Sequence, residues 1–132
     1  MNRVRLMKIP QKKFNLRAFS HAWDGIKAVV TEEPNCKVHA FFTVVAILAG
    51  FFFKLSLIEW AVILMAIGFV WAMEAINTAI EHTVDLCASE YKPAAKAAKD
   101  AAAAAVLFAA VTSMVLGIVI FLPKFLALIR SN

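Results

Sequence analysis

One apolar segment and the polar residues after it constrain this chain most. The hydrophobic run from Ile58 to Met73 is long enough to enter a bilayer. Four polar side chains follow at steps of three and four residues, which places them on one face of one helix: Glu74, Asn77, Glu81 and Asp85. Because a carboxylate at the end of a membrane helix is costly to desolvate, this face is a candidate functional site at the junction of lipid and water.

The composition supports a membrane protein. Of the 132 residues, 62% are hydrophobic and the mean hydropathy is +0.75, whereas a soluble domain carries about 45–50% apolar residues. Two cysteines, Cys36 and Cys87, are too few for a disulfide framework, so we expect free thiols. The basic residues lack the interleaved aromatic residues of a nucleic-acid surface, and we expect no nucleic-acid partner.

Hydrophobic periodicity divides the chain into an all-α arrangement. An amphipathic stretch ends before Thr31-Glu32-Glu33-Pro34, because the residue before a proline avoids helical dihedral angles. We expect this stretch to lie on the membrane surface and three later segments to cross the membrane. The expected single domain, 1–132, comprises a basic arm (1–13), a surface helix (14–31), three transmembrane helices (34–53, 57–86 and 93–122) and a tail (123–132).

The distribution of basic residues predicts the orientation. If the N-terminus is cytosolic, the inner side holds eleven lysines and arginines, eight of them within residues 1–37, and the outer side holds three. The excess of positive charge on cytosolic loops favours this arrangement. We therefore expect a multi-pass protein of a bacterial cytoplasmic membrane with its N-terminus in the cytosol.

Small residues recur at helical spacing and suggest close helix packing. Ala101, Ala105 and Ala109 form one stripe, and Ala75 and Ala79 form another. Three helices alone shield the carboxylates poorly from lipid, so a homo-oligomer that buries them is expected.

The polar residues near the cytosolic side suggest phosphate chemistry. Glu74 lies about one turn inside the hydrocarbon edge and is a candidate proton acceptor. Glu81 and Glu33 are expected at a similar depth, where two carboxylates suit a hard cation that carries phosphates. Lys99-Asp100, at the start of the third membrane segment, adds a cation for phosphate and a hydrogen-bond acceptor.

Other chemistries lack their motifs. The four glycines are far apart and form no phosphate-binding P-loop. The chain has neither the Glu-x-x-His motif of a di-iron bundle nor the Cys/His spacing of a zinc site. His39, near the start of the first membrane segment, is interpreted as an interfacial hydrogen-bonding residue and not as a ligand.

Three sequence blocks resemble a known family. Glu74-Ala-Ile-Asn-Thr-Ala-Ile-Glu81-x-x-x-Asp85, Ser89-Glu90-Tyr91 and Ala98-Lys99-Asp100 resemble the bacterial diacylglycerol kinases, which include the undecaprenol kinases. The resemblance spans roughly Phe14 to Leu122. It implies a homotrimeric membrane kinase that uses Mg-ATP from the cytosol to phosphorylate a lipid alcohol.

The resemblance also implies roles for individual residues. Glu74 matches the general base of the family, and Glu33 and Glu81 match its metal-binding glutamates. The implied nucleotide contacts are Arg17, His21, Asn77, Glu90, Tyr91, Lys92, Lys99 and Asp100. Two positions depart from the family pattern: Phe14 stands where some relatives carry arginine, and His21 where some carry tyrosine.

One alternative function belongs to a different class. A small proton-conducting or transporter-like oligomer would use Glu74 and Glu81 as a proton relay. Such a relay needs ionisable groups at several depths, and the sequence has none between Glu59 and Glu74. The sequence does not discriminate between diacylglycerol and undecaprenol as the lipid substrate.

Overall fold

The described part of the chain is a bundle of long helices and a shorter helix that runs across it. A computed structural model describes residues 17–32, 35–88, 90 and 92–131. Within these ranges the elements are α1 (Arg17–Glu32), α2 (Asn35–Phe52), α3 (Leu57–Cys87) and α4 (Pro93–Arg130), and no strand is present. The helices α2, α3 and α4 are each long and apolar enough to cross a membrane. This confirms the predicted all-α membrane architecture.

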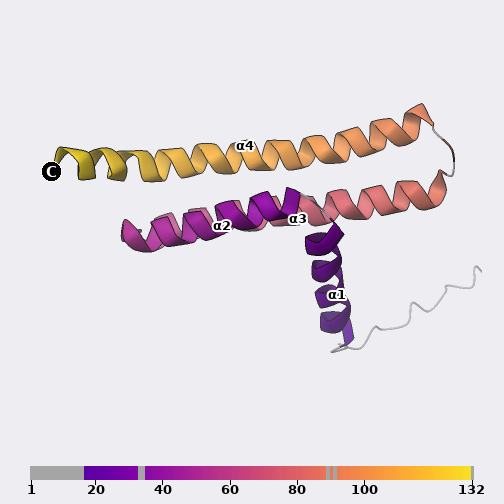
Figure 1. The fold of residues 1–132 in the computed structure, drawn as a ribbon, viewed down its shortest axis with the longest axis horizontal. Helices are drawn as coiled ribbons and strands as arrows, with labels where there is room; N and C mark the ends of the chain where they lie inside the picture. The colour runs from indigo at the N-terminus through magenta and orange to yellow at the C-terminus, as the bar shows by residue number, and fades with distance from the viewer. Residues whose placement is uncertain (1–16, 33–34, 89, 91, 132) are drawn as a thin grey trace, which may run out of the picture.

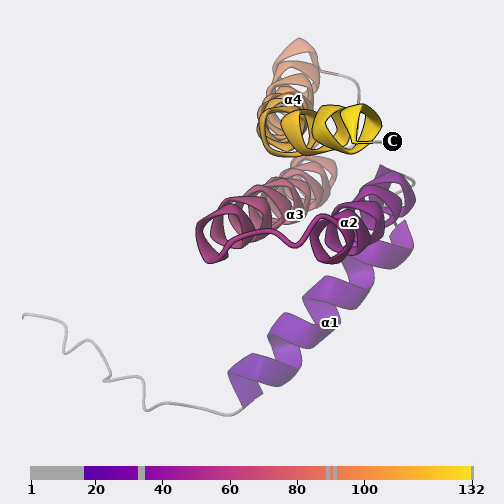
Figure 2. The same cartoon turned by 90° about the vertical axis from the view of Figure 1, so that its left-hand side faces the viewer.

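The helices α3 and α4 run antiparallel along most of their lengths (Figure 1). Helix α2 packs on another side of α3, as the end-on view in Figure 2 shows. Helix α1 is steeply inclined to α2 and α3 and lies on the side facing away from α4, and α3 and α4 continue beyond its level (Figure 1). Most large hydrophobic side chains of α2 and α4 remain exposed, as expected for surfaces that face lipid.

Small residues set the contact between α3 and α4. Ala66, Ala102 and Ala109 are buried there, and Ser113 Oγ donates a hydrogen bond of 3.0 Å to the carbonyl oxygen of Ala66. Side chains this small let two backbones approach closely. Of the predicted stripe on α4, Ala109 is buried, Ala105 is half-buried and Ala101 is exposed in this single chain, while the neighbouring Ala102 is buried.

The turn between α2 and α3 is held by specific contacts. Lys54 adopts a positive φ of 51°, and Ser56 caps α3 by accepting from the Glu59 backbone while the Glu59 side chain accepts from the Ser56 N–H. Trp60 packs on Gly50 so closely that a β-carbon at Gly50 would lie 2.6 Å from the Trp60 ring. Gly50 therefore permits the close approach of α2 and α3.

Helix α4 continues past its predicted end at Leu122. It passes through Pro123 and ends at Arg130, so residues 123–130 of the predicted tail are helical. A proline inside a helix removes one hydrogen bond but already has a helical φ. An ion pair immediately after the proline, from Lys124 Nζ to Glu59 Oε1 at 2.9 Å, ties the extension to α3.

Helix α1 is amphipathic, as predicted. Phe19, Trp23 and Ile26 are exposed apolar residues, and Val29 is buried. Lys27 and Asp24 form an exposed ion pair of 2.9 Å. The exposed apolar residues suit a helix that lies in the membrane interface. Both cysteines are free thiols, as expected, with Cys36 buried and Cys87 exposed.

Candidate active site

Glu74 is the most deeply buried charged residue described. It lies in the middle of α3 and is 1% exposed. Its Oε1 atom is 2.8 Å from Nε2 of His39 on α2. Oε1 forms this ion-pair contact but accepts no hydrogen bond in the described structure, although it is fully buried. A fully buried carboxylate oxygen that accepts no hydrogen bond from its own chain is rare, and this one is a candidate acceptor for a ligand.

A second buried acceptor lies one turn further along α3. The Asn77 side chain donates from Nδ2 to Oε1 of Glu81 at 3.0 Å, while its own Oδ1 is buried without a donor. Thr78 Oγ1 donates to the carbonyl oxygen of Glu74 at 3.0 Å and so satisfies its own hydroxyl within the helix. Two acceptors on one face of α3 therefore lack donors in the described structure.

These side chains line one groove of about 320 Å³. Helix α3 contributes Glu74, Asn77 and Glu81, while α2 contributes Asn35, Val38 and His39. The lining from α4 is apolar: Ala103, Val106, Leu107 and Ala110. The groove thus combines carboxylates at one wall with a hydrocarbon surface at the other, which suits an amphiphilic ligand with a polar headgroup.

Beyond the groove, the ends of α3 and α4 are linked by charge. Lys99 Nζ lies 2.6 Å from Oδ1 of Asp85, and Lys96 pairs with Asp100 on the same helix. The adjacent residues Lys99 and Asp100, predicted as one phosphate-binding unit, thus have different partners. Lys99 points toward α3, in line with the polar face that begins at Glu74.

The described structure does not gather every predicted residue at the groove. Glu33 and Tyr91 lie outside the described residues. Arg17 and His21 lie in the first turns of α1, whose N-terminal end points away from α3 (Figure 2), and Glu90 and Lys92 lie in or beside the α3–α4 connection. None of these described residues lines the groove.

The donor set for a metal ion is incomplete in the described chain. Among the described residues, no three histidine, cysteine, aspartate or glutamate side chains gather closely enough to hold a metal ion. Glu81 is half-buried in the groove and supplies one carboxylate. A magnesium ion takes oxygen ligands and keeps several waters or phosphate oxygens, so Glu81 and the unpaired Asn77 Oδ1 fit its chemistry.

His39 is the site residue that sequence reasoning did not place. Its position near the start of a membrane helix suggested an interfacial role, but it contacts the buried Glu74. The sequence feature that could have paired the two residues is their depth in the membrane, since His39 and Glu74 both lie near the cytosolic end of a predicted membrane segment. Which side of α2 faces α3 depends on helix packing, and the sequence alone does not determine that.

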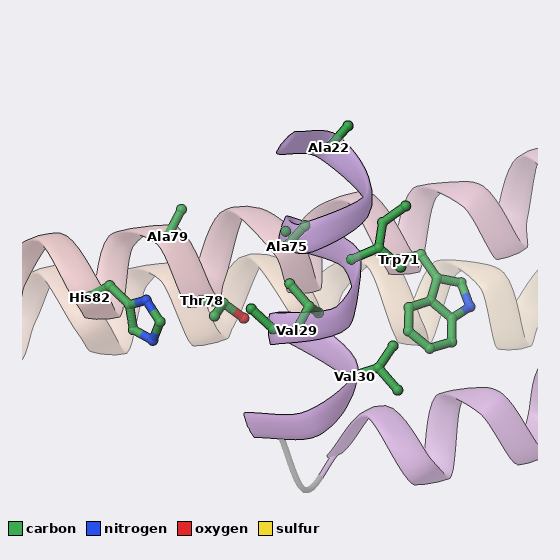
Figure 3. Close-up of a pocket in the computed structure, with 11 residues that line it drawn as sticks. Ala22, Val29, Val30, Trp71, Ala75, Thr78, Ala79 and His82 are labelled. Carbon is green, nitrogen blue, oxygen red and sulfur yellow. The ribbon is translucent and has the colours of Figure 1, made fainter. Parts of the chain in front are cut away.

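A second, larger groove of about 530 Å³ lies between α1 and α3. Figure 3 shows Val29 and Val30 of α1 opposite Ala75, Thr78 and other α3 side chains. Its lining is almost entirely apolar. The predicted small-residue stripe at Ala75 and Ala79 thus borders this groove.

Comparison with known proteins identifies the family. A family profile described as prokaryotic diacylglycerol kinase matches residues 20–121. The undecaprenol kinase of Bacillus subtilis is 47% identical over 108 residues, covering 82% of this chain and 88% of that protein. The diacylglycerol kinase of Synechocystis is 37% identical, covering 86% of this chain and 65% of that protein. The diacylglycerol kinase of Escherichia coli K12 is 26% identical, covering 76% and 82% respectively.

The matched region contains the polar face of α3, the apolar groove wall from α4 and the connection between these helices. Relatives whose names give kinase activities on two kinds of lipid match this chain over 82% and 76% of its length. The chain therefore belongs to the prokaryotic diacylglycerol kinase family and is a membrane-embedded lipid kinase.

Proposed function

We propose that this protein transfers the γ-phosphate of ATP, with magnesium, to the primary hydroxyl of a membrane lipid alcohol at the cytosolic interface. Undecaprenol is the proposed substrate, with diacylglycerol as the competing candidate. The 47% identity to an undecaprenol kinase, against 37% and 26% to two diacylglycerol kinases, supports this preference.

The buried carboxylate of Glu74, whose Oε1 accepts no hydrogen bond in the described structure, carries the proposal. A lipid hydroxyl in the groove would donate its hydrogen bond to Oε1, the buried acceptor that lacks a donor. Glu74 then accepts the hydroxyl proton as the oxygen attacks the γ-phosphorus. Since phosphoryl transfer depends mainly on positioning and charge neutralisation, one such base and a few cationic contacts suffice.

Glu81 and Glu33 are the proposed magnesium ligands. When bound, the ion would neutralise phosphate charge and hold the nucleotide in register. The hydrogen bond from Asn77 Nδ2 to Glu81 Oε1 orients that carboxylate along the polar face of α3. Glu33 is proposed from the family resemblance, as it lies outside the described residues.

The proposed nucleotide site lies where α3 and α4 extend beyond the level of α1. Lys99 is anchored to Asp85 at this end of the molecule, and its ammonium group would contact a phosphate. The other proposed contacts are Arg17, His21, Asn77, Glu90, Tyr91, Lys92 and Asp100. Because Arg17 and His21 lie away from the groove of their own chain, they would serve the site of a neighbouring subunit.

We propose a homotrimer in the bacterial cytoplasmic membrane, with the N-terminus in the cytosol. The half-buried Glu81 and the partly exposed His39 would face lipid in an isolated chain, which is costly. Cross-linking in nanodiscs should give trimers, and replacing the half-buried Ala105 with leucine should weaken them if that stripe is an interface. Monomers that retain full activity would contradict this proposal.

The direct test of function is phosphate transfer by the purified protein in nanodiscs. Labelled ATP and magnesium are supplied with undecaprenol, diacylglycerol or a lipid that has no free hydroxyl. We expect a phosphorylated product with both alcohols, a higher kcat/KM for undecaprenol, and no product without the hydroxyl. Proton conduction without any transfer would favour the alternative of a proton-conducting oligomer.

A further inference from the structure

We propose that His39 is the proton exit for Glu74: its ring accepts the proton that Glu74 takes from the lipid hydroxyl and releases it to water. The inference rests on the proposed role of Glu74 as the base. It makes His39 a residue that acts through Glu74, not one that touches the phosphate.

The need for an exit follows from proton balance. In each turnover the lipid O–H bond breaks, an O–P bond forms to the γ-phosphorus, and the bond from that phosphorus to the ADP oxygen breaks. The hydroxyl proton then resides on Glu74. Because Glu74 is 1% exposed and the lipid would occupy the groove beside it during transfer, we infer that the proton leaves through a neighbouring side chain before the next turnover.

His39 is placed for this step. Its Nε2 is 2.8 Å from Oε1 of Glu74, and its side chain is 18% exposed, so the ring links a buried carboxylate to the groove. Histidine changes charge near neutral pH and is suited to carry protons. Oε1 accepts no hydrogen bond in the described structure, so the lipid hydroxyl can donate to the same oxygen.

The other groups around Glu74 are less suited to take the proton. In the groove, α4 contributes only apolar residues, and α2 contributes Asn35 and Val38 besides His39. The remaining titratable lining residue of the described chain is Glu81, about two turns away along α3. Glu81 is already engaged by Asn77 Nδ2.

The test compares His39→Ala and His39→Gln with the wild-type protein in nanodiscs. Glutamine keeps a donor of similar length but cannot carry a proton. We expect both variants to lose about 10–100-fold in kcat, with little change in the KM values for ATP and lipid. Added imidazole should restore turnover to His39→Ala in a concentration-dependent way, but not to Glu74→Gln.

Controls separate this role from a structural one. His82→Gln, at a histidine outside the groove, should retain wild-type kcat, and thermal unfolding should show whether each variant is folded. Wild-type turnover by His39→Gln would mean that His39 only holds Glu74 in place, which overturns the proposal. Failure of imidazole to restore turnover to folded His39→Ala would overturn it as well.

Two further measurements distinguish failure of this inference from failure of the proposed function. If Glu74→Gln turns over like the wild type, the base assignment itself fails, whatever His39 does. The contact is also readable without turnover, from nitrogen-15 spectra of histidine-labelled protein. Glu74→Gln should shift the His39 ring signals and leave those of His82 in place, and unchanged His39 signals would show that the contact is absent.

Discussion

Helix α3 carries one carboxylate near each end of its most apolar stretch, Glu59 and Glu74. The two differ in how far the chain itself satisfies their oxygen atoms. Glu59 accepts from the Ser56 N–H at 2.7 Å and pairs with Lys124 at 2.9 Å. Glu74 is fully buried, contacts the His39 ring at 2.8 Å, and has an Oε1 that accepts no hydrogen bond. Glu59 closes a turn and anchors α4, whereas Glu74 is the proposed base.

The comparison shows how structural and functional carboxylates differ in a membrane protein. A group that serves the fold has its hydrogen bonds completed by the same chain, because an unpaired polar group in hydrocarbon is costly. A group that serves chemistry must keep an acceptor open, and the rest of the fold compensates for that cost. The apolar packing of Ala66, Ala102 and Ala109 along the same helix pair provides such compensation.

The largest effect should come from exchanging each carboxylate for its amide. Glu74→Gln should lower phosphate transfer by about 10²–10⁴-fold, because the amide keeps the shape but accepts no proton. Glu59→Gln should retain near-wild-type transfer and lose thermal stability. Transfer rates and unfolding in the same nanodiscs would check both. Near-wild-type turnover by Glu74→Gln would remove the contrast between the two ends.

A packing change at the Glu59 end should affect stability and not chemistry. Gly50→Ala would place a β-carbon 2.6 Å from the Trp60 ring, and such overpacking costs about 1–3 kcal/mol. The matched control is Gly117→Ala, where nothing lies within 4 Å of the added carbon. Unfolding in detergent should show a loss for the first variant only. Equal stability of the two variants would contradict the close contact of α2 and α3.

The magnesium dependence of activity should respond to changes at the proposed metal ligands and not to changes at the turn between α2 and α3. Glu81→Gln and Glu33→Gln should each raise the magnesium concentration for half-maximal activity about tenfold, or about 1.4 kcal/mol, since each removes an anionic ligand. Glu59→Gln, at the other end, should leave the curve in place. Activity measured over a magnesium series at fixed ATP tests this, and unchanged curves for both variants would refute the metal assignment.

The smallest effect concerns the two ion pairs that link α3 and α4. Asp85 and Lys99 are 64% and 36% exposed, so their coupling should be about 0.2–1 kcal/mol. Glu59 and Lys124 are 29% and 27% exposed, and their coupling should be larger because water screens it less. Double-mutant cycles on unfolding would measure both. A larger coupling energy for Asp85–Lys99 than for Glu59–Lys124 would contradict the expectation that the less exposed pair is the stronger one.

Several features were predictable because they are local. The apolar segments and the common face of Glu74, Asn77 and Glu81 follow from composition and from the helical repeat of 3.6 residues. Within one helix, spacing alone decides which side chains share a face. The sequence by itself thus determined a membrane-spanning helical protein with a polar face at one end of its central helix.

The remaining features depended on how the helices pack. Contacts between helices set the rotation of α2 about its axis, which brings His39 to Glu74, and the burial of Ala102. Lys99 and Asp100 have different ion-pair partners, and this likewise depends on where Asp85 of α3 lies. Helical periodicity is a property of one segment, but a site built across two or three helices is decided only when side-chain packing fixes their relative positions.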